Sequence, residues 1–156
     1  MLSKWIILFS LGSISFAQDI IGEGLYEEEL INFLRENYKT TTTLGYTNAR
    51  DTMYLNIDRI DGQVKGIYTN YAVDLPDTGV DPSTHLYENG MNCEHVWPRS
   101  MYEGEEPTKS DMHALRPCKD NVNSARGNKP FSEVPDEQTT TWYWQDSQTS
   151  NIPSSN

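Results

Sequence analysis

Basic residues are scarce in this sequence, and their scarcity limits the ligands that the protein can bind. The chain of 156 residues has 12 lysines and arginines against 23 aspartates and glutamates, which gives a net charge of −11 at pH 7. Phosphate groups normally meet a basic surface, so this balance argues against a general nucleic-acid-binding protein. The segment 95–130 differs, because its six basic and five acidic side chains give it a net charge of +1. The remaining residues therefore carry a net charge of −12. A polyanionic ligand is therefore expected at this segment rather than elsewhere.

Long apolar runs are missing after the N-terminus, which argues against membrane-spanning helices in the rest of the chain. Before that point, Lys4 precedes a mostly apolar stretch, and Ser15-Phe16-Ala17 matches a small-x-small cleavage site. The pattern is typical of a secretory signal peptide, residues 1–17, cleaved near Ala17. A retained anchor is the alternative, although polar residues interrupt the run and it is short for a bilayer span. We expect a secreted domain, 18–156, of about 139 residues that has no membrane contact once mature.

Cysteine is almost absent, so a single intramolecular disulfide is the most that the chain can form. Export to an oxidising environment favours a bond between Cys93 and Cys118, although the sequence does not show that they meet. The alternative is a Cys2His2 zinc site that adds His95 and His113, which would make the protein a zinc-stabilised binding module without catalysis. The Cys-x-His spacing of the first pair is shorter than common zinc-finger spacings.

Hydrophobic periodicity predicts an α+β protein. Apolar side chains recur at helical spacing over 26–38, and three glutamates in the first turn suit a helix N-terminus. A shorter helix is expected over 47–53. Alternating apolar and polar residues around Asp61-Gly62 predict a β-hairpin with strands 53–58 and 64–68. The Pro- and Gly-rich stretch 74–90 is expected to be a long loop.

The second half of the chain predicts a strand, a turn and a helix in that order. Residues 91–96 read as a short strand, and 111–115 as a strand or turn. Pro117 suits the first position of a helix that continues to about residue 126, with Gly127 as its stop. The triplet 142–144 (WYW) favours a partly buried strand, with stacking on nucleic-acid bases as the alternative.

Three motifs within this half contain the residues for phosphodiester chemistry. They read NCEHVWPRS (92–100), DMHALRP (111–117) and NVNSARGNKPF (121–131). A carboxylate such as Glu94 and an asparagine amide on the following helix would suffice for Mg²⁺, which prefers oxygen ligands and retains several waters. Because neighbouring strand residues point to opposite sides, His95 would stay free to deprotonate a water molecule.

The three motifs resemble the secreted endonuclease I family of ββα-metal (His-Me finger) nucleases. The family pattern runs approximately E-H-x-x-P, D-x-H-x-L-x-P and V-N-x-x-R-x-N, and each defining position is filled. The matching residues are Glu94, His95, Pro98, Asp111, His113, Leu115, Pro117, Val122, Asn123, Arg126 and Asn128. A single short motif would carry little weight, but three in the same order are specific.

The resemblance implies a mixed α/β fold with a ββα-metal core and a metal-dependent endonuclease that cuts DNA, and often RNA, with little sequence preference. It implies Glu94 and Asn123 as ligands of Mg²⁺ (or Ca²⁺ or Mn²⁺) and His95 as the general base. Arg126 would contact phosphate or brace the helix. Supporting roles fall to Asp111, His113 and Asn128, and candidate nucleic-acid contacts are Arg99, Arg116 and Lys129.

Three further expectations concern the whole protein. Nucleic acid is the expected partner, and no obligate protein partner is indicated. An inactive family member, for example a surface adhesin on the same scaffold, is a further alternative, which the intact Glu94, His95 and Asn123 argue against. Members of the family commonly continue beyond the equivalent of Asn156, so C-terminal truncation is one interpretation of domain 18–156.

Overall fold

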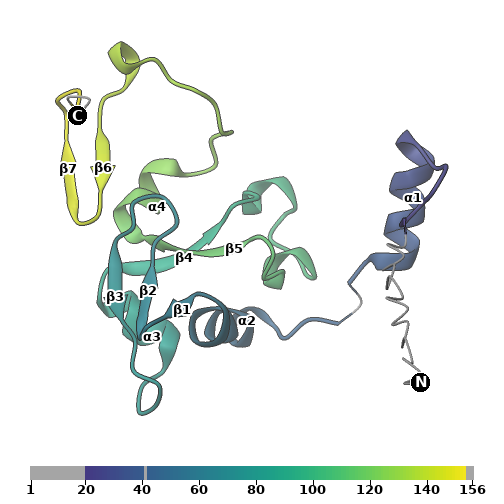
Figure 1. Cartoon of the computed structure of the whole chain (residues 1–156), viewed down its shortest axis with the longest axis horizontal. Coiled ribbons are helices and arrows are strands. Elements are labelled where there is room, and N and C mark those ends of the chain that lie inside the picture. The colour runs from purple at the N-terminus through teal and green to yellow at the C-terminus, as the bar shows by residue number, and fades with distance from the viewer. Residues whose placement is uncertain (1–19, 41, 154–156) are drawn as a thin grey trace, which may run out of the picture. The chain divides into compact units, whose positions relative to one another are not determined.

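The structure is a computed structural model that describes residues 20–40 and 42–153 (Figure 1). The predicted signal peptide lies outside these residues. The chain divides into two compact units, 1–39 and 40–156, which are described separately. No helix in the described part of the chain is long and apolar enough to cross a membrane.

The N-terminal unit contains the helix α1, Glu27–Tyr38, which confirms the helix predicted there. Three glutamates occupy its first turn, where carboxylates offset the positive end of the helix dipole. None of its residues is buried within the structure.

The second unit mixes short helices with small antiparallel sheets. The sheets pair β1 with β2 and β3, β4 with β5, and β6 with β7. In chain order the elements are α2 Tyr46–Thr52, β1 Arg59–Ile60, β2 Gln63–Lys65, β3 Ala72–Asp74, α3 Pro82–Glu88, β4 Met91–His95, β5 Leu115–Lys119, α4 Asp120–Arg126, β6 Trp142–Trp144 and β7 Ser147–Thr149. The expected α+β class is confirmed at this level.

Two predicted elements in the first half are wrong. Residues 53–58 were expected to form a strand, but α2 continues into a π-helical turn, Met53–Ile57. Ala49 and Met53 are both fully buried and lie four residues apart, so one helical face enters the core and the apparent alternation is incidental. The hairpin turn at Asp61-Gly62 is confirmed, with positive φ at both positions, and it joins β1 to β2.

The predicted loop 74–90 contains the helix α3. Asp81 caps this helix by accepting a hydrogen bond from the Thr84 backbone N–H (2.7 Å), and Pro82 takes its first position. The Asp-Pro-Ser-Thr run therefore starts a helix rather than extending the loop. Leu86 on α3 is fully buried and joins the main hydrophobic core.

The β4–β5 ribbon and the helix α4 after it position the residues of the three motifs. In this antiparallel pair His95 lies opposite Leu115 and Met91 opposite Lys119. The strand predicted at 91–96 is confirmed, whereas 117–119 belong to β5 and the helix begins only at Asp120. Pro117 is tolerated because a two-stranded ribbon consists of edge strands. Gly127 ends α4 with φ of 57°, as predicted.

Side chains on the two faces of this ribbon have different neighbours. Met91 and Leu115 face the main core, which also includes Tyr54 and Leu86. The opposite face carries Asn92 and Glu94, which meet side chains from α4. The WYW triplet forms the half-buried strand β6, as expected, and its hairpin is tied to the turn at Thr69 by a bond from the Gln145 N–H (2.8 Å).

Candidate active site

A pocket of about 310 Å³ opens at the end of β4 and brings residues of the first and third motifs together. The chain segments that form it are β4, the turn after β4, α2 and the end of α4. The residues that line it are Tyr46, Cys93, Glu94, His95, Pro98, Arg99, Ser100, Asn123, Arg126, Gly127 and Asn128. The carboxylate, the imidazole and the amide that the sequence singled out therefore line one cavity.

Glu94 is a buried carboxylate, 3% exposed, and one of its two oxygens is held by the protein. The Tyr68 hydroxyl donates a hydrogen bond to Glu94 Oε1 (2.7 Å), and Arg126 Nε lies 3.2 Å from the same oxygen. Burial raises the pKa of Tyr68, and the bond to Glu94 raises it further, so the phenol keeps its proton and remains a donor. Among the described residues, no side chain or backbone group is hydrogen-bonded to Glu94 Oε2.

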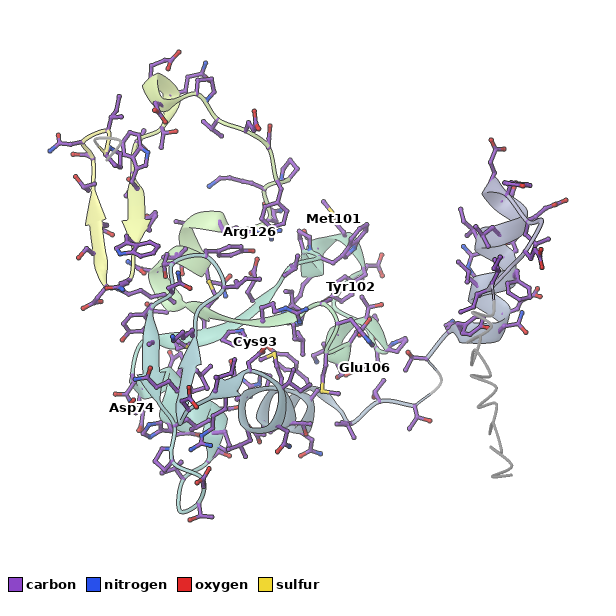
Figure 2. All side chains as sticks on the ribbon, viewed as in Figure 1. Asp74, Cys93, Met101, Tyr102, Glu106 and Arg126 are labelled. Atoms are coloured by element: carbon purple, nitrogen blue, oxygen red, sulfur yellow. The ribbon has the colours of Figure 1, made fainter. Side chains whose placement is uncertain are left out.

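Arg126 braces α4 against the end of β4. Its guanidinium donates to the carbonyls of Val96 (2.9 Å) and Gly127 (2.8 Å) and lies over the Phe131 ring, 4.7 Å from the centroid. The approach of Nε to Glu94 is an ion-pair contact without the alignment of a hydrogen bond. Since the guanidinium is engaged in these contacts, bracing accounts for its position at the end of α4. Figure 2 labels Arg126 beside this helix.

Asn123 lines the pocket and is anchored there by its amide nitrogen. Its amide nitrogen donates to Asn92 Oδ1 (2.6 Å) and to the Cys93 carbonyl (3.2 Å). A backbone carbonyl can only accept, so the bond to Cys93 fixes which end of the amide is the nitrogen. The oxygen of Asn123 is consequently left for another partner.

The environment of His95 fixes the proton on one ring nitrogen. Nε2 lies 3.1 Å from the backbone carbonyl of Lys109, which can only accept, so Nε2 carries the proton and Nδ1 has the free lone pair. The ring stacks on Tyr46 with centroids 5.3 Å apart. Burial lowers the pKa of His95, and the positive charges of Arg99 and Lys109 lower it further, although the bond to the Lys109 carbonyl opposes this.

The other predicted site residues lie at varying distances from the pocket. Arg99 and Asn128 line it. Arg116 donates hydrogen bonds to the carbonyls of Met112 and Leu115, and Lys129 donates one to the carbonyl of Ala125. The side chain of His113 is 99% exposed and bonds Asp111 Oδ1 (2.9 Å). Asp111 also accepts from the His113 N–H, so it stabilises the turn that leads into β5.

The two cysteines do not form the expected disulfide. Cys93 lies opposite Pro117 in the ribbon and Cys118 lies opposite Asn92, so the two thiols are on opposite faces of the sheet. Cβ vectors that point apart cannot be bridged without moving the backbone. The same geometry separates the Cys2His2 set, and among residues 20–40 and 42–153 no three His, Cys, Asp or Glu side chains gather to hold a metal.

Thiol titration tests this arrangement. We expect two thiols per chain to react with Ellman's reagent after denaturation without reductant, and no stoichiometric zinc in the purified protein. In the folded protein the reaction should be slow, because burial raises the pKa of Cys93 to about 11 and that of Cys118 to about 12. Denatured protein without reactive thiols would indicate a disulfide, and one equivalent of zinc would support the binding-module alternative.

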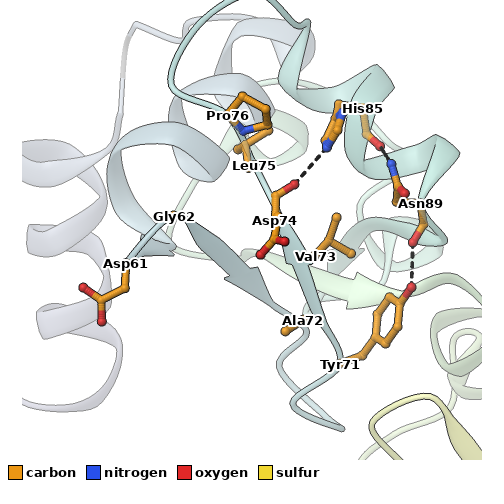
Figure 3. Close-up of a pocket in the computed structure, with 10 residues that line it drawn as sticks. All are labelled: Asp61, Gly62, Tyr71, Ala72, Val73, Asp74, Leu75, Pro76, His85 and Asn89. Atoms are coloured by element: carbon orange, nitrogen blue, oxygen red, sulfur yellow. Dashed lines mark hydrogen bonds between the residues drawn. The ribbon is translucent and has the colours of Figure 1, made fainter.

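A larger pocket, about 620 Å³, lies between β3, α3 and the β1–β2 turn (Figure 3). Within it His85 Nε2 is 2.8 Å from the Asp74 carbonyl, and the Tyr71 hydroxyl donates to the Asn89 carbonyl. Both side chains are hydrogen-bonded to backbone carbonyls of residues that line the same cavity. No residue of the three motifs lines it. Its size therefore does not make it the better candidate.

Three residues at the site were not predicted from the sequence. Tyr68 holds Glu94, Tyr46 stacks on His95, and the carbonyl of Lys109 orients the imidazole. Tyr68 and Tyr46 come from segments outside the three motifs, and a backbone carbonyl leaves no signal in the residue type.

Comparison with known proteins identifies the family. Residues 26–156 match the endonuclease I family. This match covers most of the chain and includes all three motifs. No curated protein and no solved structure matches the chain. The extent of the match, together with a pocket that gathers Glu94, His95 and Asn123, leads to one conclusion. The chain belongs to the endonuclease I family and is a nuclease, a hydrolase that acts on nucleic acid.

Proposed function

We propose that this protein is an exported, divalent-metal-dependent endonuclease that hydrolyses phosphodiester bonds in DNA and RNA with little sequence preference. In this proposal β4, β5 and α4 form the ββα-metal core. The observation that carries it is the pocket at the end of β4, where a carboxylate oxygen, an amide oxygen and an imidazole nitrogen all remain free of protein partners among the described residues.

The residues in this pocket fit a hard cation. Glu94 Oε2 and Asn123 Oδ1 are oxygen donors, and one carboxylate with one neutral oxygen suits Mg²⁺, which keeps several of its waters. Softer metals favour thiol and imidazole donors, whereas both donors assigned to the cation here are oxygens, and His95 Nδ1 is assigned to the attacking water. A bound divalent cation would neutralise charge on the phosphoryl oxygens and stabilise the departing oxygen.

His95 acts as the general base in this proposal. The Lys109 carbonyl holds the Nε2 proton, so Nδ1 can accept a proton from the attacking water as its oxygen bonds to phosphorus. Tyr46 fixes the plane of the imidazole by stacking on it. When the phosphorus–oxygen bond to the departing nucleoside breaks, that oxygen requires a proton, and solvent can supply it.

Arg99 is the best-placed residue to bind substrate phosphate. It lines the pocket beside His95, whereas the guanidinium of Arg126 is already engaged by Glu94, Val96 and Gly127. A fork of guanidinium donors matches the oxygens of a phosphate group. Local positive charge here offsets the acidity of the remaining chain for a polyanionic substrate.

Cleavage assays test the function directly. The mature protein should convert supercoiled plasmid to nicked and linear forms and should degrade RNA when Mg²⁺ is present, and EDTA should stop both reactions. The reason is that the pocket supplies only one buried carboxylate and one amide and relies on a cation for further charge neutralisation. Full cleavage in EDTA, or no cleavage with Mg²⁺, Mn²⁺ or Ca²⁺, would refute the proposal.

The pH profile should report the neutral form of His95. A base must be unprotonated, so kcat/KM should rise with pH through the pKa of this histidine. Because burial lowers that pKa, the midpoint should fall below the ordinary histidine value of 6.5. The measurement is kcat/KM between pH 4.5 and 8 with saturating metal, and a rate that falls across this range would contradict the role of His95.

A further inference from the structure

The turn that carries Tyr68 is fixed to the ribbon by its backbone. The Ile67 N–H donates to the Pro117 carbonyl (2.9 Å), which ties the turn to β5. On the other side of Tyr68, the Thr69 carbonyl accepts from the Gln145 N–H (2.8 Å) of the β6–β7 hairpin. Both neighbours of Tyr68 are thus bonded to other elements, so the backbone at Tyr68 is held between β5 and the β6–β7 hairpin.

From this turn the phenol reaches across to the carboxylate of Glu94. Its hydroxyl bonds Oε1 at 2.7 Å, and Arg126 Nε contacts the same oxygen at 3.2 Å. One oxygen of Glu94 therefore accepts a hydrogen bond from Tyr68 and forms an ion pair with Arg126, while Oε2 has no hydrogen bond within the described residues. A carboxylate that is held in this way can offer only its second oxygen to a ligand in the pocket.

We propose that Tyr68 is a positioning residue for the metal site: its hydroxyl holds Glu94 Oε1, so that Oε2 alone binds the cation. The inference rests on the proposed function, in which Glu94 is a metal ligand. Single-oxygen binding suits Mg²⁺, whose short bonds and octahedral geometry leave little room for a bidentate carboxylate beside several waters. Hydrogen bonds to a ligand orient it and tune its affinity for the metal.

The ring of Tyr68 has a second, purely structural environment. It lies 6.1 Å from the Phe131 ring, centroid to centroid, and both rings line a small apolar pocket next to α4. Tyr68→Phe keeps these ring contacts and removes only the hydroxyl, so it separates positioning from packing. Tyr71→Phe is a matched control, because the Tyr71 hydroxyl bonds the Asn89 carbonyl outside the site.

Calorimetric titration with Mn²⁺, without nucleic acid, is the primary test. Tyr68→Phe should weaken Mn²⁺ binding by about 10- to 100-fold, the range for partners of metal ligands, and Tyr71→Phe should leave it unchanged. In cleavage assays the Mg²⁺ concentration for half-maximal rate should rise by a similar factor in Tyr68→Phe. The rate at saturating Mg²⁺ and the KM for plasmid should stay close to those of the wild type.

The outcomes separate this inference from the proposed function. If wild-type protein binds Mn²⁺ and Tyr68→Phe binds it equally well, the inference is wrong and the proposed function stands. A variant that is slower at every Mg²⁺ concentration with unchanged Mn²⁺ affinity would likewise overturn it. If the wild type binds no Mn²⁺, both fail together. Equal melting temperatures for the two tyrosine variants would show that weaker binding does not reflect unfolding.

Discussion

Replacing His95 with alanine is expected to slow phosphodiester cleavage by about 10²- to 10⁴-fold, the usual contribution of a positioned general base. The imidazole lines the pocket, its Nε2 proton is held by the Lys109 carbonyl, and its Nδ1 is free to accept a proton. Alanine removes that acceptor and leaves both proposed cation ligands in place. Single-turnover cleavage of plasmid at saturating Mg²⁺ measures the effect.

Two controls show whether the loss is chemical. His113→Ala removes an imidazole of the neighbouring motif that is 99% exposed, so its rate should remain close to that of the wild type. Imidazole added to the buffer should restore part of the activity of His95→Ala, because the cavity left by the side chain can admit it. Mn²⁺ and DNA binding should be retained. A His95→Ala protein that cleaves at the wild-type rate would remove this residue from the mechanism.

The part of the fold that carries the site was largely predictable because its sequence signals are local. Apolar residues around Glu94 and His95 indicate a strand, and Gly127 marks the end of α4 because a positive φ is required there. The start of α4 was less predictable. Pro117 resembles the first residue of a helix, yet it lies in β5, because an edge strand does not need the N–H that proline lacks.

Elements that depend on tertiary packing were harder to predict. The alternation over 53–58 suggested a strand, but Met53 and Tyr54 are adjacent and both buried, because the helix from Ala49 carries them into the core. The disulfide was expected only because an exported protein meets an oxidising environment. That argument takes no account of how the two strands are paired. A shift of one residue in the pairing decides whether Cys93 and Cys118 face each other, and the register depends on which face of the ribbon packs on the core.

Likewise, the sequence motifs identified the groups that act on substrate more readily than the groups that orient them. Glu94 and His95 belong to recognisable motifs, whereas Tyr68 lies 26 residues before Glu94 in a turn that the fold brings to it. Orienting groups can come from any segment and can be backbone atoms, as Lys109 is for His95. Their identity follows from the three-dimensional arrangement of the chain.

Replacing Glu94 with glutamine should have two separable effects, loss of cleavage and loss of stability. The amide can still accept a hydrogen bond from the Tyr68 hydroxyl, but it carries no negative charge to attract a cation. The affinity for Mn²⁺ should therefore fall further than it does in Tyr68→Phe. It also leaves Arg126, whose side chain is 11% exposed, without its carboxylate. An unpaired buried charge of this kind costs about 3–5 kcal/mol, measured as the free energy of urea unfolding without metal.

The double variant Glu94→Gln/Arg126→Met distinguishes the two effects. Removing both charges of a buried pair often changes stability little, so the free energy of unfolding should be higher than in Glu94→Gln alone. The recovery should be incomplete, because methionine cannot replace the hydrogen bonds that Arg126 donates to the carbonyls of Val96 and Gly127. Cleavage should not recover, because the carboxylate proposed to hold the cation is still missing. If activity returned together with stability, Glu94 would serve the fold through Arg126 and not the reaction. Stability that returns without activity would instead separate the carboxylate's contribution to catalysis from its contribution to folding.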